Sequence, residues 1–555
     1  MANSDWYKDA VIYQIWPRSF CDGNGDGIGD LWGVYSKLDY IKSLGVDAIW
    51  FSPLYPSPNF DFGYDVADYR AINPEYGDMD IFRQVLDGAH ERGMRVIMDL
   101  VVNHTSTEHE WFKLSRDKTD PHHDYYFWRE PRRAHNGSRK MPNNWDSLFG
   151  GKAWEYDEQV GEYYLHVFAK EQADLNHDNP TVRREVADIM RFWLDMGVDG
   201  FRQDAIVYIS KVPGLPDEIP HRLAANGIKK YVDGPNLHDY LSYYRRAVSD
   251  YDCCIIGEAD HIPLQKAADF LQSGEMDMMI SFDHMRADCI GTDFIRRGFS
   301  VKRLKRALTA WQNGLAGRGW NALYLENHDH ARVISRYGSE DYRVESGKAL
   351  AAAYMLLCGT PFVYQGQEIG MTNLRLPRAD MYPDVMTRGQ VARVQGHLPD
   401  TAVLHMVQES ARDSARTPMQ WSAEANAGFT TGEPWFYVNE NYRSVNVAAQ
   451  EDDDESLLNF YRALIVFRKR EPIVRYGTYT ELLPQSPNFY CYAREYEGRR
   501  LLVIASLVAK ETYFTCPEGY ELMDGELIFK NHDLNVTVNN AFTARPYELR
   551  VYLFE

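Results

Sequence analysis

An α/β fold is predicted: a closed (β/α)8 TIM barrel with a loop-rich domain inserted after the third strand and an antiparallel β domain at the C-terminus. Short apolar runs alternate with longer amphipathic stretches, which is typical of repeated βα units. Roughly 100 residues separate the third run from the fourth, more than one helix and its loops require. From about Tyr476 onward, short strand-like segments follow one another with turns between them.

Eight apolar runs have the length of buried barrel strands. In chain order they are Ala10–Trp16, Ala48–Phe51, Arg95–Leu100, Gly200–Gln203, Cys253–Gly257, Met276–Ile280, Leu323–Leu325 and Pro361–Tyr364. Because eight parallel strands joined by helices can close on themselves, we expect all eight runs to belong to one barrel.

The domain boundaries follow from these runs. The barrel is expected at 1–103 and 175–475, an inserted domain at 104–174, an irregular active-site subdomain near 371–442, and a C-terminal β-sandwich at 476–555. Loops that follow barrel strands lie on the catalytic face. The inserted domain and the irregular subdomain should therefore both border the active site.

Composition excludes several classes of protein. The 555 residues carry a net charge of −20, which argues against nucleic-acid binding, since phosphate recognition needs clustered Lys and Arg. The 45% of hydrophobic residues can form a large core, and the 14% of aromatic residues suit stacking on sugar rings. Seven scattered cysteines without a CxxC pair, no basic-then-apolar leader and no long apolar run predict a cytoplasmic protein without a membrane partner.

Three carboxylates follow apolar strands, where a charged side chain needs solvent or a partner. They are Asp204 in GFRQD, Glu258 in GEAD and Asp329 in ENHD. The carboxyl ends of parallel barrel strands share one mouth, so these acids should converge. Glycosidic cleavage needs one carboxyl group to protonate the leaving oxygen and a second to attack the anomeric carbon or activate water. Arg202 would keep a neighbouring carboxylate ionised.

The loop DGNGDGIGD at 22–30 is a candidate cation site. Its oxygen ligands would be Asp22, Asn24, Asp26, Asp30 and the backbone carbonyl of Ile28. This spacing matches the first nine positions of an EF-hand loop, but the twelfth position is Gly33 and not Glu. A Gly- and Asp-rich turn without metal is the alternative.

Six strings occur in order along the chain: DGNGDGIGDLWG, VVNHTS, GFRQDAI, GEAD, ENHD and ARTPMQW. Together they resemble the conserved regions of glycoside hydrolase family 13, the α-amylase family, and within it the oligo-1,6-glucosidase and α-glucosidase group. The resemblance covers essentially the whole chain. It implies a retaining double displacement with Asp204 as nucleophile, Glu258 as general acid/base and Asp329 as stabiliser of the developing charge. It also implies a structural calcium ion in the 22–30 loop.

The resemblance further implies a sugar pocket. The residues expected to contact the non-reducing glucose are Tyr64, His104, Arg202 and His328. Asp61 and Arg412 would form an ion pair that closes the pocket in exo-acting members, so that only chain ends enter. Arg416 is the alternative to Arg412 in this role.

The sequence defines the linkage specificity less closely than it defines the catalytic residues. In this group the residue after the nucleophile tends to be Val in enzymes that prefer α-1,6 bonds and Thr in those that prefer α-1,4 bonds. Here it is Ala205, which is neither, whereas 206–211 and 232–241 resemble the α-1,6 type. We expect an exo-acting α-glucosidase that releases glucose from short oligosaccharides such as isomaltose, with α-1,4 bonds and sucrose left open as further substrates.

Two other functions occur among relatives of this family. Sucrose isomerases carry a loop resembling RLDRD, and RLPRAD at 375–380 overlaps it in part, which leaves isomerase or transglucosidase activity open. Non-catalytic transporter subunits of the family have a membrane helix and degraded catalytic positions, whereas all three acids are present here. The expected partner is a small oligosaccharide, bound by a monomer or weak homo-oligomer that contacts neither nucleic acid nor membrane.

Overall fold

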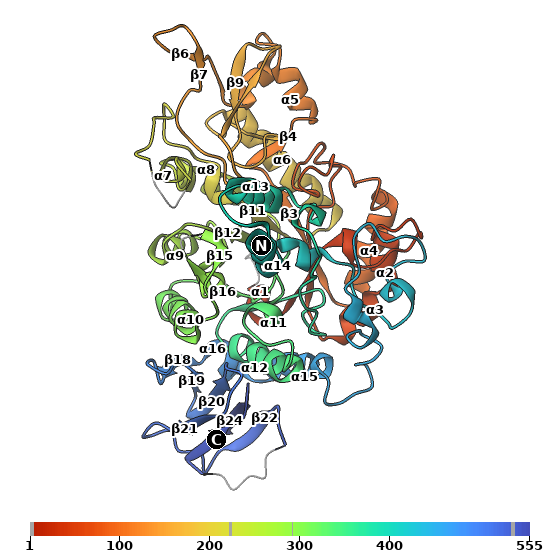
Figure 1. The fold of residues 1–555 in the computed structure, drawn as a ribbon, viewed down its shortest axis with the longest axis vertical. Helices are drawn as coiled ribbons and strands as arrows, with labels where there is room; N and C mark the ends of the chain where they lie inside the picture. The colour runs from red at the N-terminus through yellow and green to blue at the C-terminus, as the bar shows by residue number, and fades with distance from the viewer. Residues whose placement is uncertain (1–4, 221–224, 291, 534–538) are drawn as a thin grey trace.

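The computed structural model describes residues 5–220, 225–290, 292–533 and 539–555 (Figure 1). At its centre is a closed barrel of parallel strands in the spatial order β1-β17-β16-β13-β12-β11-β3-β2. The strands are β1 (Ile12–Ile15), β2 (Ala48–Phe51), β3 (Arg95–Val101), β11 (Gly200–Asp204), β12 (Cys254–Glu258), β13 (Met278–Ile280), β16 (Asn321–Leu323) and β17 (Thr360–Tyr364). Each lies in or overlaps one predicted run, which confirms the barrel. β16 begins two residues before its run, Leu323–Leu325.

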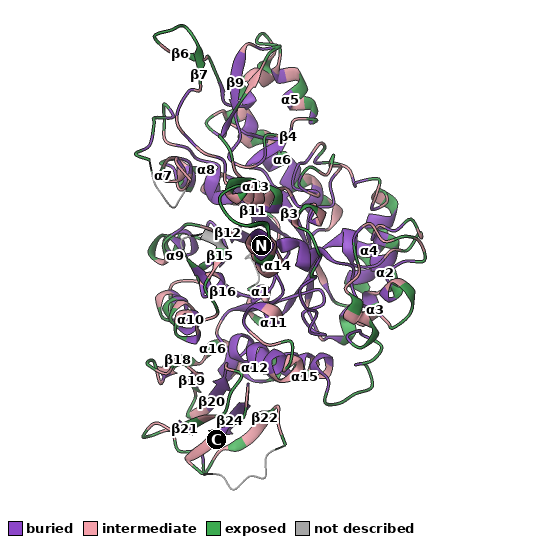
Figure 2. Cartoon of the chain, in the orientation of Figure 1, coloured by how far each residue is buried: buried purple, intermediate pink, exposed green. Residues whose placement is uncertain are grey.

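Helices cover the outside of the barrel, and the barrel strands are buried, as their purple colour in Figure 2 shows. The longer ones are α4 (Met79–Glu91), α6 (Pro180–Met196), α8 (Leu237–Ala247), α9 (Leu264–Gln272), α10 (Val301–Leu315), α12 (Arg343–Met355) and α15 (Leu457–Arg470). Shorter helices include α1 (Trp6–Asp9), α2 (Leu31–Ser36), α3 (Leu38–Ser43), α7 (Ile228–Tyr231), α11 (Val333–Arg336) and α16 (Pro472–Tyr476). Local sequence sets the limits of α6: Asn179 caps its first turn, Pro180 begins it, and Gly197 ends it at φ 111°.

The segment between β3 and β11 forms small antiparallel sheets beside the barrel mouth, drawn in orange at the top of Figure 1. Its elements are β4 (His104–Ser106), α5 (Glu110–Ser115), β5 (Trp128–Arg129), β6 (Arg132–Arg133), β7 (Arg139–Lys140), β8 (Trp154–Asp157), β9 (Glu162–Leu165) and β10 (Gln172–Asp174). Phe112, Trp128 and Tyr164 pack together as an aromatic core. β10 pairs with β4 and returns the chain to the barrel.

The segment near 371–442 differs from its prediction. It was expected to be irregular, but it contains α13 (Val385–Val394) and α14 (Asp400–Ser410) among short 3-10 turns. The helical pattern of α13 is weak because the helix is half-exposed and contains Gly389. Ion pairs of its N-cap residue Asp384, and close packing of Gly389 on the inserted segment, hold the helix in place.

The C-terminal part is antiparallel β structure, as predicted. Five strands form one sheet in the order β18 (Thr478–Leu482), β19 (Phe489–Tyr496), β20 (Arg499–Ser506), β24 (Leu549–Phe554) and β22 (Glu526–Lys530). The short pair β21 (Thr512–Thr515) and β23 (Ala541–Ala544), which was not predicted, packs Phe514 against Phe489. No helix in the described part of the chain combines the length and apolar character needed to cross a membrane.

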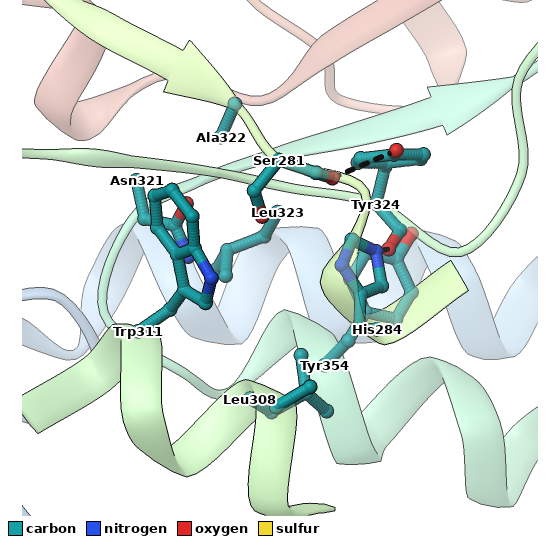
Figure 3. Close-up of a pocket in the computed structure, with 10 residues that line it drawn as sticks. Ser281, His284, Leu308, Trp311, Asn321, Ala322, Leu323, Tyr324 and Tyr354 are labelled. Atoms are coloured by element: carbon teal, nitrogen blue, oxygen red, sulfur yellow. Dashed lines mark hydrogen bonds between the residues drawn. The ribbon is translucent and has the colours of Figure 1, made fainter. Parts of the chain in front are cut away.

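A small cavity lies between α10, α12 and β16 (Figure 3), and Asp204, Glu258 and Asp329 are not among its lining residues. Next to it, the Tyr324 hydroxyl donates to the Ser281 carbonyl at 2.9 Å, and His284 Nε2 lies 2.7 Å from the Tyr324 carbonyl. Its volume of about 10 Å³ holds at most one water molecule. The cavity is a packing defect, and it is too small for a sugar.

Candidate active site

One arginine gathers three carboxylates at the mouth of the barrel. Arg202, buried in β11, lies 2.9 Å from Asp99, 2.6 Å from Asp204 and 2.8 Å from Glu258. Nη1 contacts both aspartates and Nη2 contacts the glutamate. A guanidinium suits this role because its planar fork offers several donors at once and offsets the cost of desolvating the acids. Two of the three predicted acids are therefore brought together by their predicted arginine.

The carboxyl groups of Asp204 and Glu258 differ in pKa. Burial raises the pKa of Glu258 to about 8, and the charges of Asp204 and Asp329 add to the rise while Arg202 opposes it. Burial also raises the pKa of Asp204, to about 7, against the opposing charge of Arg202. Burial raises the pKa of both acids, and Asp204, which Arg202 and a backbone strand end hold beside Glu258, has the lower of the two values. At neutral pH, Glu258 is suited to donate a proton and Asp204 to act as a carboxylate.

Asp329, the third predicted acid, lies beside two cationic groups. Its Oδ1 is 2.8 Å from Arg412 and 3.5 Å from Arg416, and its Oδ2 is 3.0 Å from Nε2 of His328. Burial by itself would raise the pKa of Asp329, but His328, Arg412 and Arg416 outweigh it and hold the pKa well below its usual range. Asp329 therefore remains ionised and can stabilise positive charge on a bound sugar.

Tyr64 and His328 form a flat wall next to these acids. Their rings stack at 5.1 Å with an angle of 9° between the planes, and Trp16 stacks on His328 at 5.5 Å. The Tyr64 hydroxyl donates to Asp99 Oδ2 at 2.9 Å and lies 2.6 Å from His328 Nε2. The amide nitrogen of Gln14 lies 2.7 Å from His328 Nδ1, so Nδ1 accepts and Nε2 carries the proton. An aromatic wall of this kind suits the apolar face of a sugar ring.

His104, also a predicted pocket residue, lies behind Tyr64. Its Nε2 is 3.0 Å from the Tyr64 carbonyl and 3.0 Å from Nε2 of Gln172, and its ring packs on Phe168 at 5.2 Å. Burial lowers the pKa of His104 to about 4 and keeps the imidazole neutral. Gln172 also donates to Asp61 at 3.2 Å and thereby links His104 to Asp61.

Asp61 and Arg412 form the ion pair that was expected between them. Arg412 is 2.6 Å from Asp61 and 2.8 Å from Asp329, and all three side chains are largely removed from solvent. Arg416 lies further from Asp329, donates to the His328 carbonyl at 3.1 Å and stacks on Trp16 at 4.3 Å. Of the two arginines, Arg412 is the one that contacts Asp61.

Ala205 connects the two catalytic strands through its backbone. Its φ of 47° and ψ of 29° lie in the left-handed region, and its amide N–H donates to Glu258 Oε2 at 2.8 Å. The residue is buried directly after Asp204. Its conformation therefore aims the carboxyl group of Glu258.

Several residues of the site were missed by sequence reasoning. They are Gln14, Trp16, Asp99, Gln172 and Asp384. Gln14 and Asp99 carry a signal that could have been used, since each is a polar residue inside an apolar run that forms a buried strand. Gln172 and Asp384 carry no such signal, because their partners come from distant segments.

The oxygen side chains predicted as ligands in the 22–30 loop accept hydrogen bonds from within the loop itself. Oδ1 of Asp22 and Oδ2 of Asp30 both accept from the Asn24 amide, at 3.0 and 3.1 Å. Asn24 Nδ2 donates to Asp26 Oδ2 at 3.1 Å. This all-oxygen set has the chemistry of a site for a hard cation. Within the described residues, however, no three His, Cys, Asp or Glu side chains converge as a metal-binding group.

Comparison with known proteins places this geometry among carbohydrate-active enzymes. Residues 14–477 match the model of the alpha-amylase catalytic domain. The oligo-1,6-glucosidase of Parageobacillus thermoglucosidasius is 46% identical over 99% of this chain and 98% of its own length. The structure of Bacillus licheniformis trehalose-6-phosphate hydrolase matches with a TM-score of 0.92 at 40% identity, covering 99% of this chain and 100% of that one. An isomaltulose synthase variant from Erwinia rhapontici NX5, solved with its natural substrate sucrose, matches with a TM-score of 0.94 at 38% identity over the full length of both chains.

Proposed function

The chain belongs to the α-amylase family of glycoside hydrolases, and we propose that it is an exo-acting α-glucosidase that releases glucose from the non-reducing ends of short oligosaccharides. One observation carries the proposal: Arg202 holds Asp204 and Glu258 together, and Arg412 joins Asp329 to Asp61, an ion pair that would close one end of a sugar pocket. A closed end admits a terminal sugar and excludes a chain that continues beyond it. The oligo-1,6-glucosidase relatives at 44–46% identity support the same activity.

The reaction follows from the protonation states of the two acids. Ionised Asp204 attacks the anomeric carbon while Glu258 donates its proton to the glycosidic oxygen, and the bond to the leaving sugar breaks. Asp329 stabilises the positive charge that develops on the ring. Glu258, now a carboxylate, takes a proton from water, whose oxygen attacks the anomeric carbon and displaces Asp204. Two inversions release glucose with retained configuration.

For the substrate, we propose α-1,6-linked disaccharides and trisaccharides such as isomaltose. A panel of isomaltose, maltose and sucrose, with the Asp204→Ala variant as the blank, tests this proposal. We expect glucose release from isomaltose with the highest kcat/KM and none above background for the blank. Equal rates in the blank would contradict the catalytic assignment, and a preference for maltose would contradict the linkage.

Sucrose isomerisation is the second candidate, because a sucrose-bound relative shares the whole fold. Arg375, the first arginine of RLPRAD, is engaged by Glu340 at 3.2 Å and Glu409 at 2.6 Å. These two ion pairs hold the Arg375 side chain at the protein surface, in the segment between β17 and α15. Products formed on concentrated sucrose separate the candidates: glucose plus fructose indicates hydrolysis, and an isomeric disaccharide indicates isomerisation.

Three further properties belong to the proposal. The oxygen ligands of the 22–30 loop support a structural calcium ion, which would brace the turn before α2 and take no part in the chemistry. All seven cysteines are free, which supports a reducing, cytoplasmic location. The net charge of −20 makes copies repel one another and favours a monomer or weak homo-oligomer.

A further inference from the structure

Helix α13 begins beside the Asp61–Arg412 ion pair and is held in place at two points. It comes from the segment between β17 and α15, and in Figure 1 it lies between the barrel and the inserted segment. One fastening is its N-cap residue, Asp384. The other is Gly389, one turn into the helix.

The first fastening joins α13 to the closing ion pair. Oδ1 of Asp384 accepts from the amides of Met386 and Thr387 and caps the helix. Oδ2 lies 2.9 Å from Arg412 Nε and 2.8 Å from Arg416 Nη1. The same carboxylate therefore begins the helix and holds the guanidinium that contacts Asp61.

The second fastening joins α13 to the inserted segment. A Cβ atom added to Gly389 would lie 1.8 Å from the carbonyl oxygen of Phe149, far inside van der Waals contact. The obstacle is backbone, so a rotamer change cannot relieve it. The Phe149 ring in turn lies 5.3 Å from the guanidinium of Arg412. The helix can approach this closely only because residue 389 has no side chain.

The two fastenings surround Arg412. Asp61 and Asp329 hold it from the barrel side, Asp384 holds it from α13, and Phe149 covers it from the inserted segment. These four contacts fix the position of the Arg412 guanidinium. A displacement of α13 would move Asp384 and would open the seam between the helix and Phe149.

We propose that α13 is the roof of the sugar pocket and that Gly389 and Asp384 are specificity-determining residues, which confine the enzyme to single terminal glucose units by holding Arg412 against Asp61. The proposal rests on the exo-acting function proposed above and adds the element that enforces it. Neither residue touches the reacting atoms, so both are positioning residues. Their loss should weaken binding of the terminal glucose more than it slows bond cleavage.

The test uses the full-length enzyme with Gly389→Ala, and a tetrasaccharide labelled at its reducing end. We expect KM and the inhibition constant of free glucose to rise about tenfold, with kcat changed much less, because small misplacements of binding groups have effects of this size or larger. We also expect disaccharide to appear among the early products, since a chain can then extend past the opened end. Asp384→Asn, which keeps a side-chain oxygen for the cap and removes the charge, should raise the same two constants.

Gly314→Ala in α10 is the matched control. It is the same substitution inside a helix, and the nearest atoms to its new Cβ all belong to the Leu264 side chain, which can move, and not to backbone. We expect it to leave KM, glucose inhibition and products unchanged. If Gly389→Ala behaves like this control, the roof proposal is wrong. If Gly389→Ala fails to fold, unchanged constants in Asp384→Asn overturn the proposal. Failure of the parent enzyme to release glucose would instead refute the proposed function.

Discussion

Arg202 contacts the two acids of the proposed mechanism with its two terminal nitrogens: Nη1 lies 2.6 Å from Asp204 Oδ1 and Nη2 lies 2.8 Å from Glu258 Oε2. A single rigid guanidinium therefore sets the distance between the proposed nucleophile and the proposed proton donor. Asp99 takes part of the same positive charge at 2.9 Å. The attraction of Arg202 for the Glu258 carboxylate lowers the pKa of Glu258 by less than burial raises it. Glu258 therefore keeps its proton at neutral pH.

The first prediction concerns the alkaline limit of activity. Burial raises the pKa of Glu258 to about 8, and the acid is active in its protonated form. The kcat/KM for isomaltose should therefore fall about tenfold per pH unit as pH rises through this value. It should also fall below about pH 7, where Asp204, which must be ionised to attack, takes up a proton. Glu258→Gln should lose most activity on isomaltose but retain more on an aryl glucoside, whose leaving group needs no proton. A pH profile without an alkaline limb near 8 would contradict the assignment.

The second prediction concerns Asp99. Replacing Asp99 by Asn removes a negative charge from Arg202 and leaves more of the guanidinium charge for Glu258. The pKa of Glu258 should fall, so the alkaline limb should move to lower pH, and kcat should drop roughly 10- to 100-fold as Arg202 loses its anchor. Tyr55→Phe, a nearby control, removes only a hydroxyl that donates to the Asp99 carbonyl. An unshifted limb in Asp99→Asn would show that Asp99 does not tune Glu258.

Much of the fold and part of the site could be predicted from the sequence. What could be predicted differs physically from what could not. An apolar run predicts a buried strand. An acid at the end of such a run, such as Asp204 or Glu258, indicates a functional site because burial of a charge is costly. Asp384 belongs to a segment with weak periodicity, and its partners Arg412 and Arg416 lie about 30 residues away. Contacts of that kind are set by how segments pack, and no local pattern in the sequence records them.

The third prediction concerns the 22–30 loop. If calcium binds there, a chelator should lower the melting temperature by roughly 2–5 °C, because a ligand that binds only the folded state stabilises it. Asp26→Ala should remove the response to chelator, and Asp524→Ala, an exposed acid outside the loop, should preserve it. The kcat of the fully folded enzyme should not change, since the loop supplies no reacting group. Equal melting temperatures with and without chelator would show that the loop is stable without metal.

The fourth prediction concerns linkage preference and Ala205. Its left-handed backbone suits a β-branched residue poorly, at a cost of about 1–3 kcal/mol, so Ala205→Val and Ala205→Thr should melt at lower temperature than the parent, whereas Ala205→Gly relieves the conformation. If the side chain selects the linkage by its bulk beside the leaving sugar, the Val and Thr variants should change the ratio of isomaltose to maltose hydrolysis, and the Gly variant should not. If residue 205 acts only through its N–H bond to Glu258, the Val and Thr variants should slow both substrates equally and leave the ratio as it is. An unchanged ratio in both variants would therefore remove Ala205 as a specificity residue and leave its backbone as the part that matters.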